Sequence, residues 1–451
     1  MSLSSLLSIA RSALLTHKRA MEVTAHNVAN AQTPGYSRQR LQLHASAPLR
    51  TPEGLVGRGV TAEIVSRSRD QFYDAAYRRE SGLFSQSSTL RDGLLQIEDA
   101  MGEPSDIGLS AALDRMFHAF SDLANDPASP ASRDLVVRAG DRLATQLNQL
   151  DQRLGTAGSD AYSRLEAQTQ QANELMRRIA DLNRNILAAG GAIAVDLQDS
   201  RDNAIDALSE LMTVHVVSHD DGTVSLIGEG ANLVDRVTPA RLSVTGSGSN
   251  VAVVDAGGTM LGAVGGSMGG ALDLIDRKLP AIRAQLDLLA GSLATEVNAV
   301  HRTGFTASGA TNTDFFDPTR LTAGTIKLTD ALLNSSGAVA ASGSNLAGDG
   351  SVALQLAQLG SSPVGLLGAR SFRDFFSSVA AGVGLAVQGA SADSDVEQSL
   401  MDQADQRRTA VSGVSIDEEM VNLMSQQQAY GAAAKIITAA DEMIQVLLNS
   451  I

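Results

Sequence analysis

The chain has 451 residues, 43% of them hydrophobic, and it contains no cysteine. Its length allows two to four globular domains, and the lack of cysteine excludes disulfides, thiolate metal sites and cysteine nucleophiles. The formal net charge is −15, yet residues 1–80 hold 11 basic and 6 acidic side chains, a local excess of +5. This asymmetry predicts complementary contacts between copies of the chain or between its parts.

The N-terminal segment carries apolar residues at alternating steps of four and three positions, the spacing of a coiled-coil seam. The pattern ends before Pro34 and Gly35, where proline disfavours the α region for the preceding residue and glycine suits the positive φ of a type II turn. We therefore predict a helix that is followed by a sharp turn at residues 30–36. The predicted seam consists of Leu3, Leu7, Ala10, Leu14, His17, Met21, Thr24 and Val28.

A second seam of the same kind occupies the C-terminal segment. Ser415 and Glu418 have the spacing of a capping box, so a helix is predicted to begin beside them. Polar residues interrupt both seams, which suits a partly wet interface of several helices better than a dry two-helix core. The predicted C-terminal seam consists of Ile416, Met420, Leu423, Gln427, Tyr430, Ala434, Ile437, Asp441, Ile444, Leu448 and Ile451.

The terminal helices are predicted to be marginal as an isolated pair. Burial of a large apolar side chain stabilises by about 1.5 to 3 kcal/mol, whereas fixing the backbone of one residue costs about 1 kcal/mol or more before hydrogen bonds offset it. We expect both termini to be largely unfolded in the free monomer and to become ordered beside other copies.

The first half of the interior predicts a β-ribbon and then long helices. Residues 41–64 alternate apolar and polar side chains, which favours extended strands. Helical periodicity then continues to about residue 212, with a kink expected at residues 155–158 because two glycines lie there. Residues 213–269 carry short alternating runs, which are typical of a small β insertion.

The second half of the interior returns to helices. One helix is predicted at residues 271–302, interrupted by Pro280, and a last long helix at residues 371–409. Between them, residues 304–365 are rich in glycine, serine, alanine and threonine. We expect this segment to be either a loose insertion or an exposed linker.

Together these patterns predict a mainly α fold, an elongated multi-domain helical bundle with paired N- and C-terminal coiled-coil helices and a small β insertion. The predicted domains are residues 1–40 with 410–451 as a terminal coiled-coil domain, 41–212 with 270–305 and 366–409 as a long-helix bundle with a β-hairpin, 213–269 as the β insertion, and 306–365 as a second insertion or part of an outer domain.

No catalytic, metal or cofactor site is predicted, so we expect a protein that is not an enzyme. The seven histidines never pair at ligand spacing on a predicted helix. Four aspartates line one side of a predicted helix, where a cation site or acid/base chemistry is the alternative to a solvated face paired with Arg201. We prefer the solvated face. The four aspartates are Asp196, Asp199, Asp202 and Asp206.

Neither nucleic acid nor a membrane is expected as a partner. The arginines of the basic N-terminal segment are scattered, and the acidic remainder of the chain would repel phosphate. The uncharged stretch 375–392 contains three glycines, three serines and a glutamine, which favours a buried helix over a membrane span.

Two terminal motifs resemble the bacterial flagellar axial proteins, which are the rod, hook and hook-associated proteins. Residues 29–39 read Ala-Asn-Ala-Gln-Thr-Pro-Gly-Tyr-Ser-Arg-Gln, and residues 412–419 read Ser-Gly-Val-Ser-Ile-Asp-Glu-Glu. Rod and hook proteins share both motifs, so the interior has to distinguish the members. Residues 102–127 and 197–202 are similar to the flagellar hook-associated protein 1 family, whose members join hook and filament.

The resemblance implies a noncatalytic building block that is exported through the flagellar type III apparatus without a cleaved signal peptide. It implies a ring of about eleven subunits, with the terminal helices as an inner tube, the long helices as the next shell and the insertions outside. The implied partners are the chain itself, the hook protein, the next hook-associated protein toward the filament, and a cytosolic export chaperone that binds the C-terminal segment. The implied assembly interface consists of Leu3, Leu7, Leu14, Met21, Asn27, Asn30, Pro34, Gly35, Tyr36, Met420, Leu423, Tyr430, Ile437, Ile444 and Leu448.

Three alternative functions stay open at this point. A hook or distal rod protein of the same family is the nearest, and it would lack the long interior helices. A flagellum-linked peptidoglycan hydrolase would need a cleft with paired carboxylates, which the sequence does not single out. A secreted coiled-coil adhesin or effector would be found on the cell surface away from flagella.

Overall fold

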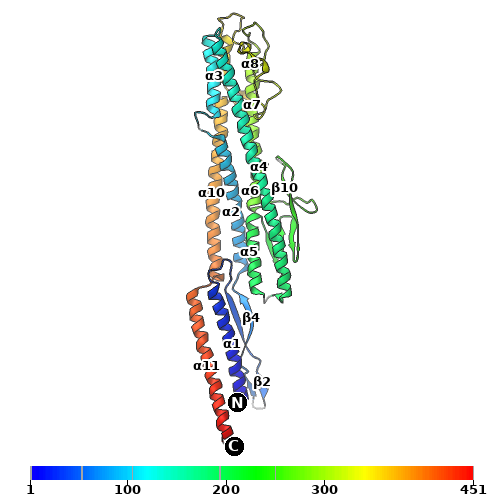
Figure 1. Cartoon of the computed structure of the whole chain (residues 1–451), viewed down its shortest axis with the longest axis vertical. Coiled ribbons are helices and arrows are strands. Elements are labelled where there is room, and N and C mark those ends of the chain that lie inside the picture. The colour runs from blue at the N-terminus through cyan, green and yellow to red at the C-terminus, as the bar shows by residue number, and fades with distance from the viewer. Residues whose placement is uncertain (1–2, 52–53, 104, 192–193, 249, 450–451) are drawn as a thin grey trace.

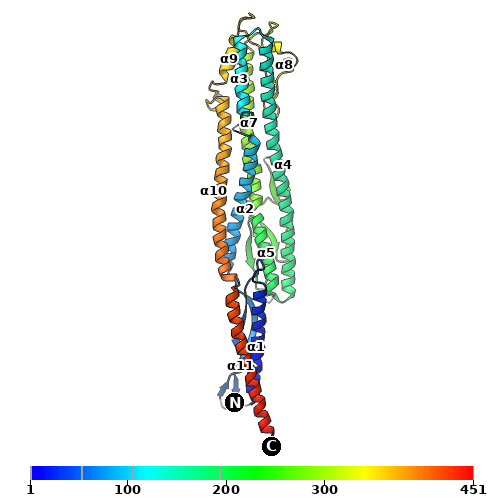
Figure 2. The same ribbon diagram turned by 60° about the vertical axis from the view of Figure 1, so that its left-hand side comes forward.

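The protein is a long rod in which a helix bundle makes up one part and a helix pair with a β-ribbon makes up the other (Figure 1). The structure is a computed structural model that describes residues 3–51, 54–103, 105–191, 194–248 and 250–449. Both termini lie at the same tip of the rod, and a second view shows the same arrangement (Figure 2). The predicted elongated, mainly α fold is confirmed, whereas the predicted seam residue Ile451 lies outside the described residues.

Long helices fold back on one another to form the bundle. They are α2 (Gln71–Met101), α3 (Leu109–Asn125), α4 (Pro130–Ala188), α5 (Val195–Leu211), α6 (Gly266–Asp273), α7 (Leu279–His301) and α10 (Phe372–Ser412). α10 packs along α2, and α3 packs against α4. Their facing sides share a continuous core in which Phe120, Leu147 and Ile179 are fully buried.

Helix α4 runs without a break through the position of the predicted kink. Ser129 caps its first turn by accepting a hydrogen bond from the Ser132 amide, and at 1.5 Å per residue the 59-residue helix is roughly 90 Å long. Gly158 does not interrupt the helix, and it lies where α7 packs against α4. A Cβ there would lie 2.6 Å from Cδ2 of Leu279, so glycine lets the start of α7 approach α4 closely.

The predicted interruption at Pro280 is confirmed as a change of helix type. α6 continues into a π-helical turn, Leu274–Lys278, before α7 begins at Leu279. Proline lacks an amide donor and is tolerated in the first turn of a helix. The π-helical turn also directs Leu274 against α2, where a Cβ on Gly93 would lie 2.2 Å from that leucine.

A small antiparallel β structure lies on the side of α4. The strands β5 (His215–Ser218), β6 (Val224–Gly228), β7 (Ala231–Asp235) and β8 (Thr238–Pro239) form one sheet in sequence order, and β9 (Leu242–Thr245) pairs with β10 (Ala252–Asp255). Two asparagines of α4 hold the strands. Asn183 donates to the Val224 carbonyl at 2.8 Å, while Asn173 both donates to and accepts from the backbone of Leu242 at 2.8 Å.

The segment between α7 and α10 is a packed cap on the distal end of the bundle and not a loose linker. It contains α8 (Asp330–Asn334), α9 (Ser351–Leu359) and the short 3₁₀ turns Ser336–Ala338 and Gly365–Leu367. Phe315 and Phe316 are fully buried, and the Asn298 side chain of α7 accepts from both of their amides. The expectation of a linker was wrong because the few large apolar residues nucleate a core around which the small residues turn.

The lower part of the rod joins both chain ends. It contains α1 (Leu3–Ala29), α11 (Ile416–Asn449) and a ribbon formed by β1 (Gln39–Ala45), β2 (Leu49–Thr51), β3 (Gly54–Val56) and β4 (Val60–Arg67). β1 pairs with β4 and β2 pairs with β3, both antiparallel. The ribbon packs along α1, so it lies with the terminal helices, whereas the sequence division grouped it with the bundle.

The helical run from Phe372 to Val446, which α10 and α11 share, includes one stretch that is long and apolar enough to cross a membrane by length and composition alone. One third of that stretch, 33%, is buried within the protein. Part of its apolar surface is therefore open to contact with other helices.

Truncation of the bundle core should destabilise the whole rod. Leu147→Ala removes a fully buried side chain of α4 and is expected to lower the free energy of unfolding by about 2 to 5 kcal/mol, because a cavity remains. Leu135 lies on the same helix with 53% of its surface exposed, so Leu135→Ala should change stability by less than about 0.5 kcal/mol. Urea denaturation followed by circular dichroism measures both values, and equal losses would contradict this assignment of the core.

Candidate functional site: the terminal helices and their joint

The terminal helices α1 and α11 run antiparallel and meet along a seam of small and polar residues. Nδ1 of His17 lies 2.7 Å from Oε1 of Gln426, and Asn27 donates to Glu419 at 3.0 Å. In this register Ala10 lies opposite Ala433, and both residues are buried. The helices therefore approach closely without enclosing a large apolar core.

The register of the C-terminal seam differs from the prediction at every second position. The predicted positions Leu423 and Ile437 lie partly buried at the seam, whereas the predicted Gln427 and Asp441 are exposed. At these positions the residue that faces α1 is the one directly before the predicted residue, and Ala433 and Ala440 let the two helices approach closely. The inward face consists of Glu419, Leu423, Gln426, Tyr430, Ala433, Ile437, Ala440 and Ile444.

Helix α11 consequently exposes a row of large apolar side chains. Their exposed fractions range from 44% to 69%, which is unusual for residues of this size on a helix without a further partner. The row is referred to below as the α11 outer face. It consists of Ile416, Met420, Val421, Met424, Ile436, Met443, Val446 and Leu448.

The residues of the implied assembly interface therefore fall into separate groups. Met420 and Leu448 lie on the α11 outer face, and Asn27 is buried in the joint described below. Pro34 and Gly35 are exposed at the turn. The remaining members are partly buried, and they are Leu3, Leu7, Leu14, Met21, Asn30, Tyr36, Leu423, Tyr430, Ile437 and Ile444.

The predicted turn after α1 has the expected backbone geometry. The Tyr36 amide donates to the Thr33 carbonyl at 3.2 Å, and Gly35 has φ +73°. The turn also touches the bundle, because a Cβ at Gly35 would lie 1.9 Å from Oδ1 of Asn203 in α5. Glycine is required here both for the backbone conformation and for the contact with α5.

Asn27 closes the joint between α1, the ribbon and α11. Its Oδ1 accepts hydrogen bonds from the Gln39 amide at 2.9 Å and from the Tyr36 hydroxyl at 2.8 Å. Its Nδ2 donates to the Gln39 carbonyl at 2.9 Å and to Glu419 at 3.0 Å. One buried amide thus uses its donors and acceptors to fix three segments of the chain.

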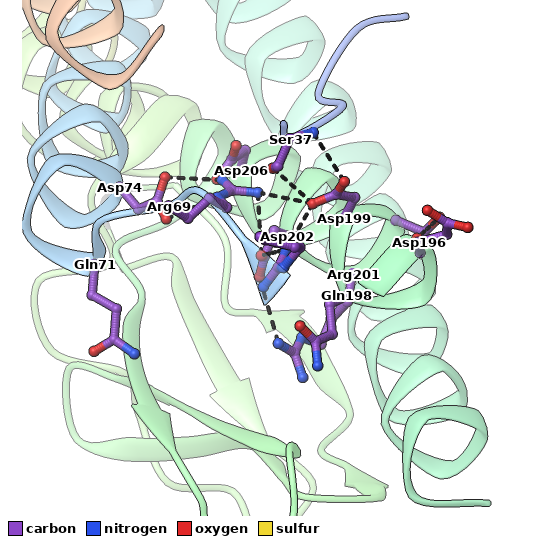
Figure 3. Close-up of polar contacts among 12 residues, drawn as sticks. Ser37, Arg69, Gln71, Asp74, Asp196, Gln198, Asp199, Arg201, Asp202 and Asp206 are labelled. Carbon is purple, nitrogen blue, oxygen red and sulfur yellow. Dashed lines mark hydrogen bonds and ion pairs between the residues drawn. The ribbon is translucent and has the colours of Figure 1, made fainter. Parts of the chain in front are cut away.

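Asp199 and Asp202 of α5 are buried and ion-paired, and Asp206 is partly buried and ion-paired, so the prediction of a solvated face was wrong for these three residues. Asp196 is exposed, as predicted. Asp199 accepts from the Ser37 amide at 3.0 Å and from the Ser37 hydroxyl at 2.8 Å. Arg67 donates to both Asp199 and Asp202 at 2.7 Å. The exposed fractions of these two aspartates are 5% and 7%. Figure 3 shows these carboxylates converging on the end of the ribbon and the start of α2.

Three further arginines extend this network to α2 and α10. Arg69 bonds Asp74 at 2.9 Å and lies 3.2 Å from Asp202. Arg78 and Arg408 donate to opposite oxygens of Asp206 at 2.6 and 2.7 Å. These arginines were not predicted as partners, although they lie in the basic excess of residues 1–80 and in α10. The sequence did contain one indication of these pairs. Four aspartates on one helical face need cationic partners if they are buried, and such partners can come from other segments of the chain.

Arg201 pairs with Asp202, as predicted, and also has a second role. Its Nη2 approaches Asp202 only at 3.7 Å, while its Nη1 donates to the Gly222 carbonyl at 2.7 Å and to Asn183 at 3.2 Å. The side chain therefore ties α5 to α4 and to the turn between β5 and β6.

Burial and charge act in opposite directions on the pKa of Asp202. Burial by itself raises the pKa of this carboxyl, but Arg69, Arg67, Arg201 and Arg78 lower it, and the net pKa lies below the ordinary value of 3.8. The carboxylate is therefore charged at neutral pH, and the network holds it as an anion.

Arg38 connects the ribbon to the start of α11. Its Nε donates to Glu419 at 2.8 Å and its Nη1 donates to Glu418 at 2.9 Å. Its backbone amide donates to the Ser412 carbonyl at 2.8 Å, where α10 ends. These contacts fix the direction in which α11 leaves the bundle.

A metal ion needs a particular arrangement of ligand side chains. Among the residues that the structure describes, no group of three or more His, Asp or Glu side chains is placed to hold a metal ion. The carboxylates of the joint are instead engaged by arginine and serine. What this arrangement provides is mechanical: it couples the terminal helix pair to the bundle.

Three family models match different parts of the chain. The flagellar hook-associated protein FlgK helical domain matches residues 94–316. The flagella basal body rod protein model matches residues 7–36, and the flagellar basal body rod FlgEFG protein C-terminal model matches residues 405–450. The two terminal matches cover the helices that form the seam.

Similar proteins match over the whole chain. Flagellar hook-associated protein 1 of Bacillus subtilis (strain 168) is 29% identical over 493 residues, which covers 98% of this chain and 97% of that protein. The Escherichia coli (strain K12) protein of the same name is 25% identical over 559 residues, covering 99% and 100%. The solved flagellar hook junction protein FlgK from Burkholderia pseudomallei has a TM-score of 0.66 at 18% identity and covers 76% of this chain and 100% of that one, so the fold is shared.

Neutralising Asp202 should weaken the joint. Asp202→Asn removes one of the buried counter-charges of the surrounding arginines and is expected to lower the free energy of unfolding by about 3 to 5 kcal/mol at neutral pH. Because the folded-state pKa is depressed, the native carboxylate stabilises fully above its unfolded pKa and loses that effect as pH falls through the folded pKa. The difference in the free energy of unfolding between the unaltered protein and Asp202→Asn should therefore become smaller at acidic pH.

Asp196 provides the matched control on the same helix, because its side chain is exposed. Asp196→Asn should cost less than about 1 kcal/mol. Urea denaturation of the three proteins at neutral and acidic pH measures these differences. If the loss of unfolding free energy in Asp202→Asn is the same at neutral and acidic pH, the conclusion that Asp202 is held as an anion is wrong.

Gly35→Val should detach the turn from α5. A side chain at this φ costs about 1 to 3 kcal/mol, and its Cβ would collide with Asn203. Faster amide exchange of Ser37, whose amide bonds Asp199, is the expected result. Gly57→Val is the control, since a Cβ there meets nothing within 4 Å. Unchanged exchange in Gly35→Val would show that the turn does not hold the joint.

Proposed function

Because this chain belongs to the flagellar hook-associated protein 1 family, we propose that it is a structural subunit at the junction between flagellar hook and filament, where it permits filament assembly. The α11 outer face is the observation that carries the proposal. A helix with this much exposed apolar surface is stable only when other helices cover it. Terminal helices that pack side by side in a closed assembly provide that cover.

The rod shape suits a layered cylinder. In this proposal the terminal helices form the inner tube, the bundle forms the next shell and the β insertion with the distal cap lies outside. A ring of about eleven subunits fits an interface in which each copy contacts the next by a heterologous surface, since such contacts close into rings or continue as helices. The hook protein and the next hook-associated protein toward the filament are the axial neighbours.

Export precedes assembly in the proposed sequence of events. Before export, a cytosolic chaperone would cover the C-terminal segment, including Ile437, Ile444 and Leu448. The chain would then pass unfolded through the flagellar type III apparatus. A helix pair with a small apolar seam separates at low energetic cost, which favours export. The proposed role is noncatalytic.

A deletion strain tests the proposal directly. Cells that lack the chain should build hooks without filaments, visible by electron microscopy, and the unaltered chain should restore filaments. Filaments on hooks of the deletion strain would contradict a junction role. A distal rod role predicts instead that hooks are missing.

A chain with Ile437→Asp should fail to restore filaments in the deletion strain. The substitution places a charge in the α1–α11 seam, where Ile437 is partly buried, and burial of an unpaired carboxylate opposes helix pairing. Met260→Asp is the control, because Met260 is 63% exposed at the β insertion, away from the terminal helices. Counting filaments per cell distinguishes the two variants, and normal counts for Ile437→Asp would remove this residue from the assembly interface.

A further inference from the structure

The lower part of the rod has two chemically different flanks. α1 packs against α11 and also against β1 and β4 of the ribbon, so α1 is the middle layer. The outer flanks are therefore the α11 outer face and the ribbon. A second copy placed beside the first could continue this layer order, with α11 of one copy against the ribbon of the next.

The ribbon tip, residues 54–58 with Arg50, is basic and apolar. Leu55 is 71% exposed, and Arg50 and Arg58 are exposed as well. In the described part of the chain, neither of these two arginines forms an ion pair or side-chain hydrogen bond. Among the described residues, the tip thus presents two unpaired cations beside an exposed leucine, and the sequence places Glu53 between them.

The C-terminal part of α11 presents the opposite character. Asp441 and Glu442 are exposed and, within the described residues, have no ion-pair partner. Met443 and Val446 beside them are 44% and 69% exposed. Lys435 is the only basic residue of α11, one and a half turns before this acidic pair.

The two surfaces also match in height along the rod. In both views the ribbon tip lies near the level of the N-terminus, at the end of the rod where α11 finishes (Figures 1 and 2). Copies related by rotation about an axis parallel to the rod keep equal heights, so such a ring would hold the two surfaces of adjacent copies at the same level. They differ from each other, so the contact is heterologous and self-propagating.

We propose that the ribbon tip of one copy binds the C-terminal part of α11 in the adjacent copy, with Arg50 and Arg58 opposite Glu442 and with Leu55 against Met443 and Val446. Asp441 adds negative charge at the edge of this contact. This inference rests on the proposed function, because the partner is a second copy in the same ring. In this contact the ribbon covers part of the α11 outer face, and Arg50 and Arg58 gain acidic partners.

Disulfide cross-linking tests the contact, because the chain has no cysteine of its own. Gly57→Cys lies on the ribbon tip, where a side chain meets nothing within 4 Å, and Gln445→Cys lies on the exposed side of α11. Hooks isolated from a deletion strain expressing the double variant should yield a ladder of cross-linked copies after mild oxidation. Each single variant, and Gly57→Cys combined with the exposed α10 position Ser399→Cys, should yield none.

Exchanging the charges of the two surfaces tests the proposed contact independently. Arg50→Glu with Arg58→Glu should abolish the ladder and filament growth, and adding Asp441→Arg with Glu442→Arg in the same chain should restore both. If the unaltered chain is not found in isolated hooks, the proposed function at the hook–filament junction is wrong. A chain that is present in hooks but gives no ladder, or a charge exchange that restores neither readout, would overturn the proposed contact alone.

Discussion

In the pair of α1 and α11, alanines and polar side chains occupy the closest contacts, and this limits the apolar area that the two helices bury against each other. Ala10 and Ala433 bring the helix axes together, while His17 and Gln426 add a polar contact. The large side chains of α11 consequently face outward. A pair built in this way holds its helices together but leaves most of the available apolar burial for neighbouring copies.

The joint transmits what happens at the terminal pair to the rest of the rod. Buried carboxylates are costly unless they are neutralised and hydrogen-bonded, and in this protein arginines from the ribbon, α2 and α10 neutralise the aspartates of α5. Separating the terminal pair from the bundle would expose or strand these charges. The direction of the terminal helices is therefore fixed relative to the bundle, although the pair itself is weakly held.

The sequence predicted those features that depend on local patterns. The turn at Gly35, the interruption at Pro280 and the strands near residue 215 follow from backbone chemistry. The partners of Asp199 and Asp202 could not be predicted, because they come from segments more than a hundred residues away. Ala433 was missed as a seam residue because the predicted seam used Ala434, one residue further along, and hydrophobicity does not distinguish two neighbouring alanines. The distal cap was misread for the related reason that Phe315 and Phe316 are few among many small residues.

The central claim is that the terminal helices acquire most of their stability from adjacent copies, and amide hydrogen exchange measured before and after assembly tests it most directly. The account predicts fast exchange for residues 3–29 and 416–449 in the dilute monomer, slow exchange in the bundle, and strong protection of both terminal helices in assembled hooks. Protection of the terminal helices in the monomer equal to that of α4 would contradict the account.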